Sequence, residues 1–139
     1  MKIILKTFII LFVFANISCK AQQMVQTRND VYKLKANEQQ FLNKPLKNLL
    51  KEIKPEIKMA FGIVDYPSFF AFKFFTPTEI NRRVIGRKHN SIYIYVEEPI
   101  DWNFDKRVKG KEYQWTKEDL EKYGNLTVTR IKVVQRIED

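Results

Sequence analysis

Residues 57–75 read Ile-Lys-Met-Ala-Phe-Gly-Ile-Val-Asp-Tyr-Pro-Ser-Phe-Phe-Ala-Phe-Lys-Phe-Phe, and this stretch decides the fold class. Residues 57–64 alternate with a period of two, which indicates a half-buried strand. Residues 65–68 carry the composition of a turn. Residues 69–75 are apolar on both faces except at Lys73, as expected of a central strand. We predict that one face holds Phe70, Phe72 and Phe74, and the other Phe69 and Phe75.

Two more strands are predicted towards the C-terminus. Residues 92–96 alternate isoleucine or valine with tyrosine, which favours a third strand. Residues 126–137 favour a fourth, but Leu126 and Val128 share one parity while Ile131 and Val133 take the other. A β-bulge near residues 129–130 would bring all four to one face. Because neighbouring strands are joined by short turns, we expect a mainly antiparallel sheet of four strands.

The helices are expected before the first strand and before the last. A main helix is predicted from the apolar spacing i, i+3, i+4 and i+7 at Leu46, Leu49, Leu50 and Ile53, with Asn43 as its cap and Pro55 as its end. A short helical turn precedes it, opened by Asn37 with Gln40.

A short second helix is predicted between a capping box, Thr116 with Asp119, and a terminating glycine, Gly124. The predicted order is α-β-β-β-α-β. This order corresponds to an α+β fold in which the main helix packs on one face of the sheet.

The N-terminus has the pattern of an export signal. Lys2 and Lys6 precede an apolar run, residues 8–15, which is too short to span a bilayer. Ile17-Ser18-Cys19 follows and resembles the lipobox of bacterial lipoproteins, and residues 18–23 are similar to the start of short flavobacterial lipoproteins. The resemblance implies acylation of the Cys19 thiol, cleavage before it, and anchoring in a membrane. It carries no catalytic residue.

This resemblance divides the chain into three parts. Residues 1–18 are expected to be a signal peptide, residues 19–36 a lipidated tether, and residues 37–139 a single α+β domain. Lys20 is compatible with sorting to the outer membrane, on its periplasmic side. Two alternatives stay open: cleavage after Ala21, which would release a soluble protein, and an uncleaved anchor.

The composition narrows the choice of partner. The formal net charge is +9, from 25 Lys and Arg against 16 Asp and Glu. For an exported chain this excess favours an acidic protein or an anionic envelope component over nucleic acid, so no nucleic-acid partner is expected. The alternative is that the charge serves solubility alone. The oligomeric state is left open.

Catalytic and metal sites are not expected. The chain has one histidine, His89, and its one cysteine belongs to the leader, so neither a metal ion nor another cofactor is predicted. We place His89 in an exposed basic loop. Adjacent strand residues point to opposite faces, so Glu97 and Glu98 cannot converge. A hydrolase of envelope polymer, using Asp101 and Asp105, is the catalytic alternative.

Two groups of residues are candidates for binding. A cationic cluster, Arg82, Arg83, Arg87 and Lys88, matches carboxylate or phosphate groups, unless it is a solvated hairpin tip. An aromatic platform would combine Tyr93 and Tyr95 with Trp102 and Trp115, unless the tryptophans belong to the core. The sequence therefore predicts a non-catalytic binding or accessory module of the cell envelope. The alternative within binding proteins is an inhibitor or immunity protein that neutralises an acidic partner.

Overall fold

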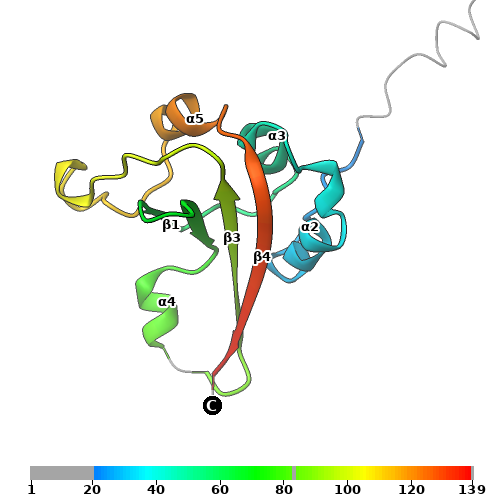
Figure 1. The fold of residues 1–139 in the computed structure, drawn as a ribbon. Coiled ribbons are helices and arrows are strands. Elements are labelled where there is room, and N and C mark those ends of the chain that lie inside the picture. The colour runs from blue at the N-terminus through cyan, green and yellow to red at the C-terminus, as the bar shows by residue number, and fades with distance from the viewer. Residues whose placement is uncertain (1–20, 83, 139) are drawn as a thin grey trace, which may run out of the picture.

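The computed structural model describes residues 21–82 and 84–138, and its centre is a four-stranded antiparallel sheet (Figure 1). Its strands are β1 (Met59–Ile63), β2 (Phe69–Lys73), β3 (Lys88–Val96) and β4 (Val128–Ile137), which pair in sequence order. Each strand runs antiparallel to the next. The α+β class and the antiparallel sheet are thus confirmed.

The predicted facing of Phe70, Phe72 and Phe74 is also confirmed, whereas Phe75, predicted on the opposite face, belongs to the same core cluster. Phe70, Phe72 and Phe74 are buried, and the first two pair with Ile94 and Ile92 of β3. We call the face that carries these residues the inner face. Burying one such side chain contributes roughly 1.5–3 kcal/mol, so this row is a large part of the core.

The predicted bulge lies in β4. Tyr95 pairs with Arg130 and Val96 with Val128, which leaves Thr129 unpaired between them. Because of this extra residue, Val128 and Ile131 both face inward and are fully buried.

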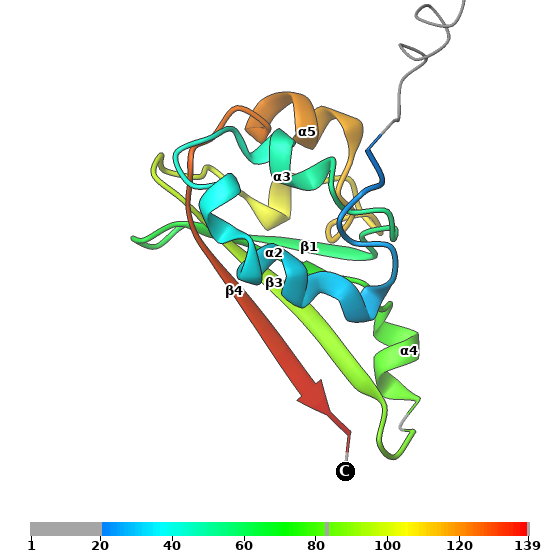
Figure 2. The same cartoon turned by 90° about the vertical axis from the view of Figure 1, so that its right-hand side faces the viewer.

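Helices cover the inner face (Figure 2). They are α2 (Tyr32–Ala36), α3 (Leu46–Leu50) and α5 (Lys117–Tyr123), and three 3₁₀ turns accompany them: η1 (Arg28–Val31), η2 (Glu38–Gln40) and η3 (Phe104–Lys106). Another short helix, α4 (Pro77–Asn81), lies beyond the end of β2. The described residues therefore hold more helices than the two that we predicted, and in another order. Within residues 21–82 and 84–138, no helix has both the length and the apolar character that a membrane crossing requires.

The main helix is shorter than predicted, and its predicted cap is wrong. Asn43 has a positive φ of 59° and precedes the N-cap, Pro45, while the helix ends at Leu50. The Asn43 N–H donates to the Val128 carbonyl at 2.8 Å, and the Lys44 carbonyl accepts from the Val128 N–H at 3.0 Å. Pairing with the last strand therefore prevents a helical start at Asn43. The apolar stripe that predicted the helix is nonetheless turned to the core.

The short helix α5 begins as predicted. Thr116 is its N-cap, and its hydroxyl accepts from the Asp119 N–H at 3.1 Å while the Asp119 carboxylate accepts from the Thr116 N–H at 2.9 Å. Gly124 is the C-cap, with a right-handed φ of −62°. Its carbonyl accepts from the Lys47 N–H at 2.8 Å, so this glycine lies where α3 and α5 come closest.

The connection that joins β2 to β3 is structured at both ends. Thr76 caps α4 in a capping box with Glu79, and Pro77 occupies the first turn. Lys88 to Asn90 already belong to β3. The Thr76-Pro77-Thr78-Glu79 pattern is a start signal that sequence reasoning passed over.

The folded part of the chain begins earlier than residue 37. Val25, Val31 and Leu34, which we assigned to the tether, are buried in the core. The Val25 N–H donates to the Glu52 carbonyl at 2.8 Å, and Val25 forms a parallel bridge with Ile53. Residues 25–36 of the segment that we assigned to the tether are therefore part of the domain. The predicted signal peptide and Cys19 lie outside the described residues.

Candidate binding face of the sheet

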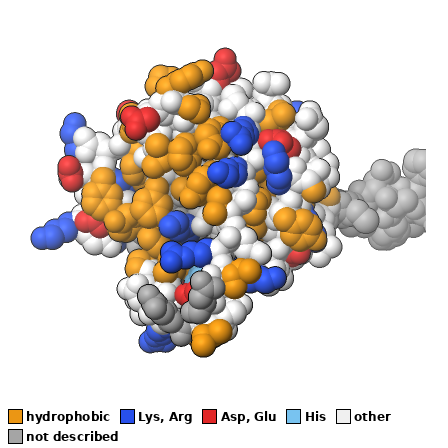
Figure 3. Space-filling model, turned by 60° about the horizontal axis from the view of Figure 1, so that its bottom comes forward, with side chains coloured by type: hydrophobic (Ala, Val, Ile, Leu, Met, Phe, Trp, Pro, Cys, Tyr) orange, Lys and Arg blue, Asp and Glu red, His pale blue; other side chains and the backbone are white. Residues whose placement is uncertain are grey.

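The second face of the sheet, which we call the outer face, carries none of α2, α3 and α5. The strand register places on it Met59, Phe61, Ile63, Phe69, Ala71, Lys73, Ser91, Tyr93, Tyr95, Arg130, Lys132, Val134 and Arg136. Figure 3 shows apolar side chains gathered across the middle of a face of the molecule, with Lys and Arg among them.

Aromatic side chains form the centre of the outer face. The Phe69 ring stacks on Tyr93 at 5.3 Å between centroids and lies 4.9 Å from Tyr95. On β1, Phe61 packs against Tyr113, which belongs to the long loop between β3 and α5, at 4.8 Å. The rings of Phe61, Phe69, Tyr93 and Tyr95 are only partly buried. Their mutual packing, worth about 0.5–1.5 kcal/mol per pair, holds them in place before any partner binds.

Cations lie beside these rings. The Lys73 ammonium is 5.3 Å from the centroid of Phe61, and the Arg130 guanidinium is 5.2 Å from that of Tyr95. Lys132 and Arg136 are exposed on β4. Among the residues that the structure describes, none of these four cations forms an ion pair. The outer face therefore carries four cations that have no ion-pair partner among the described residues.

A pocket of about 610 Å³ opens between α4 and the lower end of this face, with Lys73, Tyr93 and Arg136 in its lining. His89 also lines it, so the predicted placement of this residue in an exposed loop is wrong. It lies on β3 with 8% of its surface exposed, and its Nε2 is 2.8 Å from Glu138 Oε1. Because β3 begins at Lys88, His89 lies inside the sheet, and Glu138, directly after β4, supplies the carboxylate.

Glu138 is held as the anion by its surroundings. The Val84 N–H donates to its carboxylate at 2.8 Å, and this hydrogen bond, with burial opposing it and the contact with His89 adding to it, lowers its pKa. The Phe75 ring meets the imidazole of His89 edge to face at 4.5 Å. These contacts fix the end of the β3–β4 pair beside the pocket.

The predicted cationic cluster is partly assembled. Arg82, Arg87 and Lys88 line a pocket of about 700 Å³ together with Arg28, whereas Arg83 lies outside the described residues. Arg87 donates to the Glu79 carbonyl at 2.9 Å, and Arg28 forms an ion pair with Glu79 at 3.7 Å. Sequence reasoning missed Arg28 because its segment was assigned to the tether.

The predicted aromatic platform does not form. Trp102 is 9% exposed and packs on the inner side of β1, where a Cβ added to Gly62 would lie 2.5 Å from the Trp102 Cβ. Trp115 stacks parallel to Trp102 at 6.4 Å and meets Phe72 edge to face at 5.0 Å. The tryptophans therefore close the core, while Tyr93 and Tyr95 point to the other side of the sheet.

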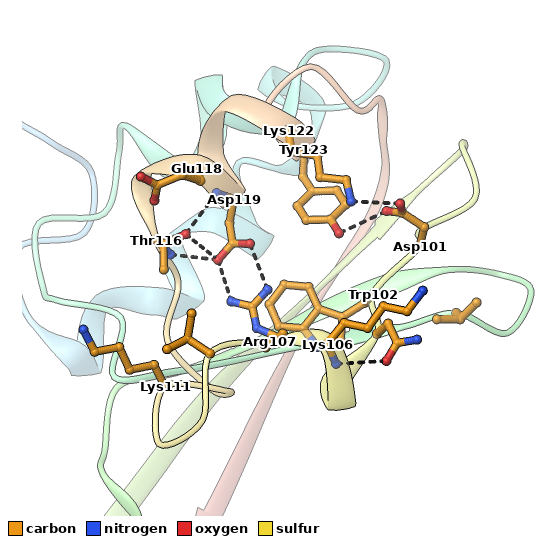
Figure 4. A pocket seen from close by; sticks show the side chains of 13 residues that line it. Asp101, Trp102, Lys106, Arg107, Lys111, Thr116, Glu118, Asp119, Lys122 and Tyr123 are labelled. Atoms are coloured by element: carbon orange, nitrogen blue, oxygen red, sulfur yellow. Dashed lines mark hydrogen bonds and ion pairs between the residues drawn. The ribbon is translucent and has the colours of Figure 1, made fainter.

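Trp102 contributes to the lining of another pocket, of about 730 Å³, next to α5 (Figure 4). Arg107 lies over the Trp102 ring at 3.8 Å and makes a bidentate ion pair with Asp119, at 2.9 and 2.7 Å. Two further N–H groups donate to the carbonyls of Glu112 and Gln114 at 2.8 and 2.7 Å. Four of the five N–H donors of Arg107 therefore hold the loop together and tie it to α5.

The acidic residues of this region are stabilised as anions. Burial raises the pKa of Asp119, but hydrogen bonds from Arg107 and Thr116 outweigh it and lower the pKa. Lys122 and the Tyr123 hydroxyl lower the pKa of Asp101 in the same way. Glu98 is bonded to the Thr127 N–H and hydroxyl, both at 2.7 Å. A general acid needs the opposite environment, one that raises the pKa.

Asp105, the second residue of the predicted carboxylate pair, is exposed in η3. Groups of three or more His, Cys, Asp or Glu side chains that could hold a metal ion do not occur within residues 21–82 and 84–138.

Comparison of the chain with models of known protein families, with curated proteins and with solved structures found no match. The inference about function therefore starts from the geometry of the outer face and from the leader.

Proposed function

We propose that this protein is an exported, lipid-anchored binding module of the bacterial cell envelope, without catalytic activity. Acylation of Cys19 would hold it on the outer membrane, facing the periplasm, and its outer face would bind an anionic partner. The leader supports the anchoring, because Ile17-Ser18-Cys19 resembles a lipobox.

The observation that carries the binding proposal is the juxtaposition of partly exposed aromatic rings and unpaired cations on an uncovered sheet face. Aromatic residues and arginine are enriched at the centres of protein interfaces, where they supply much of the binding energy. Lys73, Arg130, Lys132 and Arg136 have no ion-pair partner among the described residues, so their charge is available to a partner. An acidic protein or an anionic envelope component would supply negative charges opposite these cations.

The carboxylates support a non-catalytic role. Asp101, Asp119 and Glu98 each accept hydrogen bonds that lower their pKa values, so they are poor proton donors at neutral pH. A hydrolase of the kind we considered needs one carboxyl group to stay protonated.

The binding proposal is tested by charge reversal on the outer face. The variant Arg130→Glu/Lys132→Glu is compared with Lys44→Glu/Lys47→Glu, which changes the net charge equally at exposed positions before and within α3. Both are expressed with the native leader, and partner recovery from detergent-solubilised membranes is quantified. We expect the first variant to lose at least tenfold in recovery and the second to match the wild type. Equal recovery of the partner with both variants would contradict the proposal that the outer face binds it.

The anchor is tested separately by mass spectrometry of the mature N-terminus. We expect an acylated Cys19 as the first residue. A chain that begins at Gln22 without acyl mass contradicts the anchor and leaves the binding face untouched.

A second candidate is an inhibitor that neutralises an acidic protein through the pocket of Arg28, Arg82, Arg87 and Lys88. The observation that favours it is that the fold adds Arg28 to the predicted cluster. In the same recovery assay, Arg82→Glu would then lose the partner while Arg130→Glu/Lys132→Glu keeps it.

A further inference from the structure

The two edges of the sheet differ in how their backbone groups are satisfied. At the β1 edge, the Ala60 N–H donates to the Tyr113 carbonyl at 2.7 Å, so the long loop covers that edge. The first part of β4 is covered as well: the Val128 carbonyl accepts from Asn43, and the Ile131 N–H donates to Glu38 Oε1 at 2.8 Å.

The rest of β4 has no such cover. The Glu138 N–H points to β3, where it donates to the Arg87 carbonyl, and the Ile131 N–H points away from β3. By the alternation of an antiparallel ladder, the N–H and C=O groups of Val133, Gln135 and Ile137 also point away from β3. Within the described residues these groups have no backbone partner, since β4 pairs with β3 alone. Figures 1 and 2 show this half of β4 running on beyond α2 and α3.

The charges along this open edge indicate what can pair with it. The outer-face side chains of β4 are Arg130, Lys132, Val134 and Arg136, and the three cations are exposed. Residues directly opposite on an added strand would lie about 4.5–5.5 Å away, and like charges opposite each other are destabilising. A second copy paired antiparallel about Val134 would place Lys132 opposite Arg136. An acidic strand would instead place carboxylates opposite the cations.

We propose that residues 133–137 of β4 accept an extended segment of a partner protein that carries acidic residues at alternate positions and adds a fifth strand to the sheet. Backbone hydrogen bonds to Val133, Gln135 and Ile137 supply affinity, and the cations select the sequence. This inference rests on the proposed function and deepens it, because it assigns the anionic partner to the class of proteins and gives its conformation.

The test uses the acetylated peptide Thr-Glu-Val-Glu-Val-Glu-Thr with the full mature chain in detergent, observed by amide hydrogen exchange in NMR. We expect the peptide to slow exchange at Val133, Gln135 and Ile137 by at least tenfold. The amides of Lys132 and Val134 point to β3, so their exchange should stay unchanged and serves as the internal control.

Two N-methylated peptides separate strand addition from charge attraction. If the peptide pairs antiparallel to β4 with its glutamates opposite the cations, the valine N–H groups point to β4 and the glutamate N–H groups point away. N-methylation of both valines should weaken binding at least tenfold, whereas N-methylation of two glutamates should preserve it. Equal binding of the two peptides overturns strand addition but leaves charge-driven binding to the outer face intact.

Charge exchange on the protein gives a further test. The variant Lys132→Glu/Arg136→Glu should lose the glutamate peptide and bind the same peptide with lysine in place of glutamate. If anionic phosphatidylglycerol vesicles bind to the wild type and the peptide does not, the assignment to a protein partner is wrong while the proposed function stands. Protection of Val133 and Gln135 in the absence of peptide, together with a dimer mass in solution, would show that a second copy occupies the edge and would overturn the proposal.

Discussion

The ion pair of Arg107 and Asp119 allows a quantitative test of how this domain is held together. In Asp119→Ala, Arg107 keeps its charge but loses a bidentate partner in a site where the two side chains are 15% and 9% exposed. Removing one member of a buried pair costs about 3–5 kcal/mol, because the other charge is left without compensation. The hydrogen bonds from the Thr116 N–H and hydroxyl to the same carboxylate are lost with it, at about 1 kcal/mol, while the Thr116 hydroxyl still caps the backbone N–H of residue 119. We therefore expect a loss of roughly 4 kcal/mol in the free energy of unfolding.

The matched control is Asp101→Ala in the same pocket. Asp101 also contacts a cation, Lys122 at 2.8 Å, and a hydroxyl, Tyr123 at 3.1 Å, but its side chain is 72% exposed. Exposed pairs contribute about 0–1 kcal/mol. Urea unfolding followed by tryptophan fluorescence gives the free energy of unfolding of both variants. In thermal unfolding, the melting temperature of Asp119→Ala should be roughly 10–20 °C below that of the wild type. Comparable losses in the two variants, or a loss below 1 kcal/mol for Asp119→Ala, would refute this account of the pocket.

The same pair predicts a dependence on pH. The pKa of Asp119 is lowered in the folded protein, since the bonds from Arg107 and Thr116 outweigh the effect of burial. A depressed carboxyl pKa contributes stability above the unfolded value, about pH 4, and that contribution is lost as the pH falls through the folded value. The difference in stability between wild type and Asp119→Ala should therefore narrow below about pH 4. A constant difference from pH 7 to pH 2 would contradict the sign of the pKa change.

Three further changes test the packing and the edge of the sheet. Gly62→Ala should cost about 1–3 kcal/mol in chemical denaturation, because the new methyl group would overlap a tryptophan side chain; a neutral result would show that the indole can move aside. Leu34→Ala should lower the free energy of unfolding by about 2–5 kcal/mol, whereas Tyr32→Ala, at an exposed position of the same helix, should lower it by less than about 1 kcal/mol. Similar losses in the two variants would mean that the N-terminal segment does not unfold together with the rest of the domain. Glu38→Ala should speed hydrogen exchange of the Ile131 amide by at least tenfold, because that N–H loses its acceptor; unchanged exchange would contradict the coverage of this part of β4.

The parts of the fold that the sequence predicted are those that local pattern controls. The two-residue period of a strand predicted that Phe70, Phe72 and Phe74 share a face of β2. The parity change between Val128 and Ile131 predicted the bulge, because one inserted residue reverses the direction of every later side chain. The capping box at Thr116 joins two residues that are three positions apart, so the local sequence is enough to predict it. The composition predicted an excess of positive charge, but it could not predict that four of the cations lie on the outer face of the sheet.

The parts that could not be predicted depend on contacts distant in sequence. The start of α3 is displaced by hydrogen bonds between Asn43 and Val128, which are 85 positions apart along the chain by their numbers. Val31 and Leu34 belong to a helical segment too short to show a period. Arg107 is one of several cations in its loop, and what distinguishes it is contact with Trp102 and Asp119, which the folded chain brings together.

The pairing of the first folded segment with the last strand has a consequence for how the chain comes to be folded. A polypeptide is synthesised from its N-terminus, so β4, which is hydrogen-bonded to Asn43 and Glu38, is made after the helical segments that pack on it. Until then the early helices have no surface on which to dock, and short helices are unstable by themselves. We therefore expect the early helices to become stably packed only once β4, residues 128–137, is free to pair.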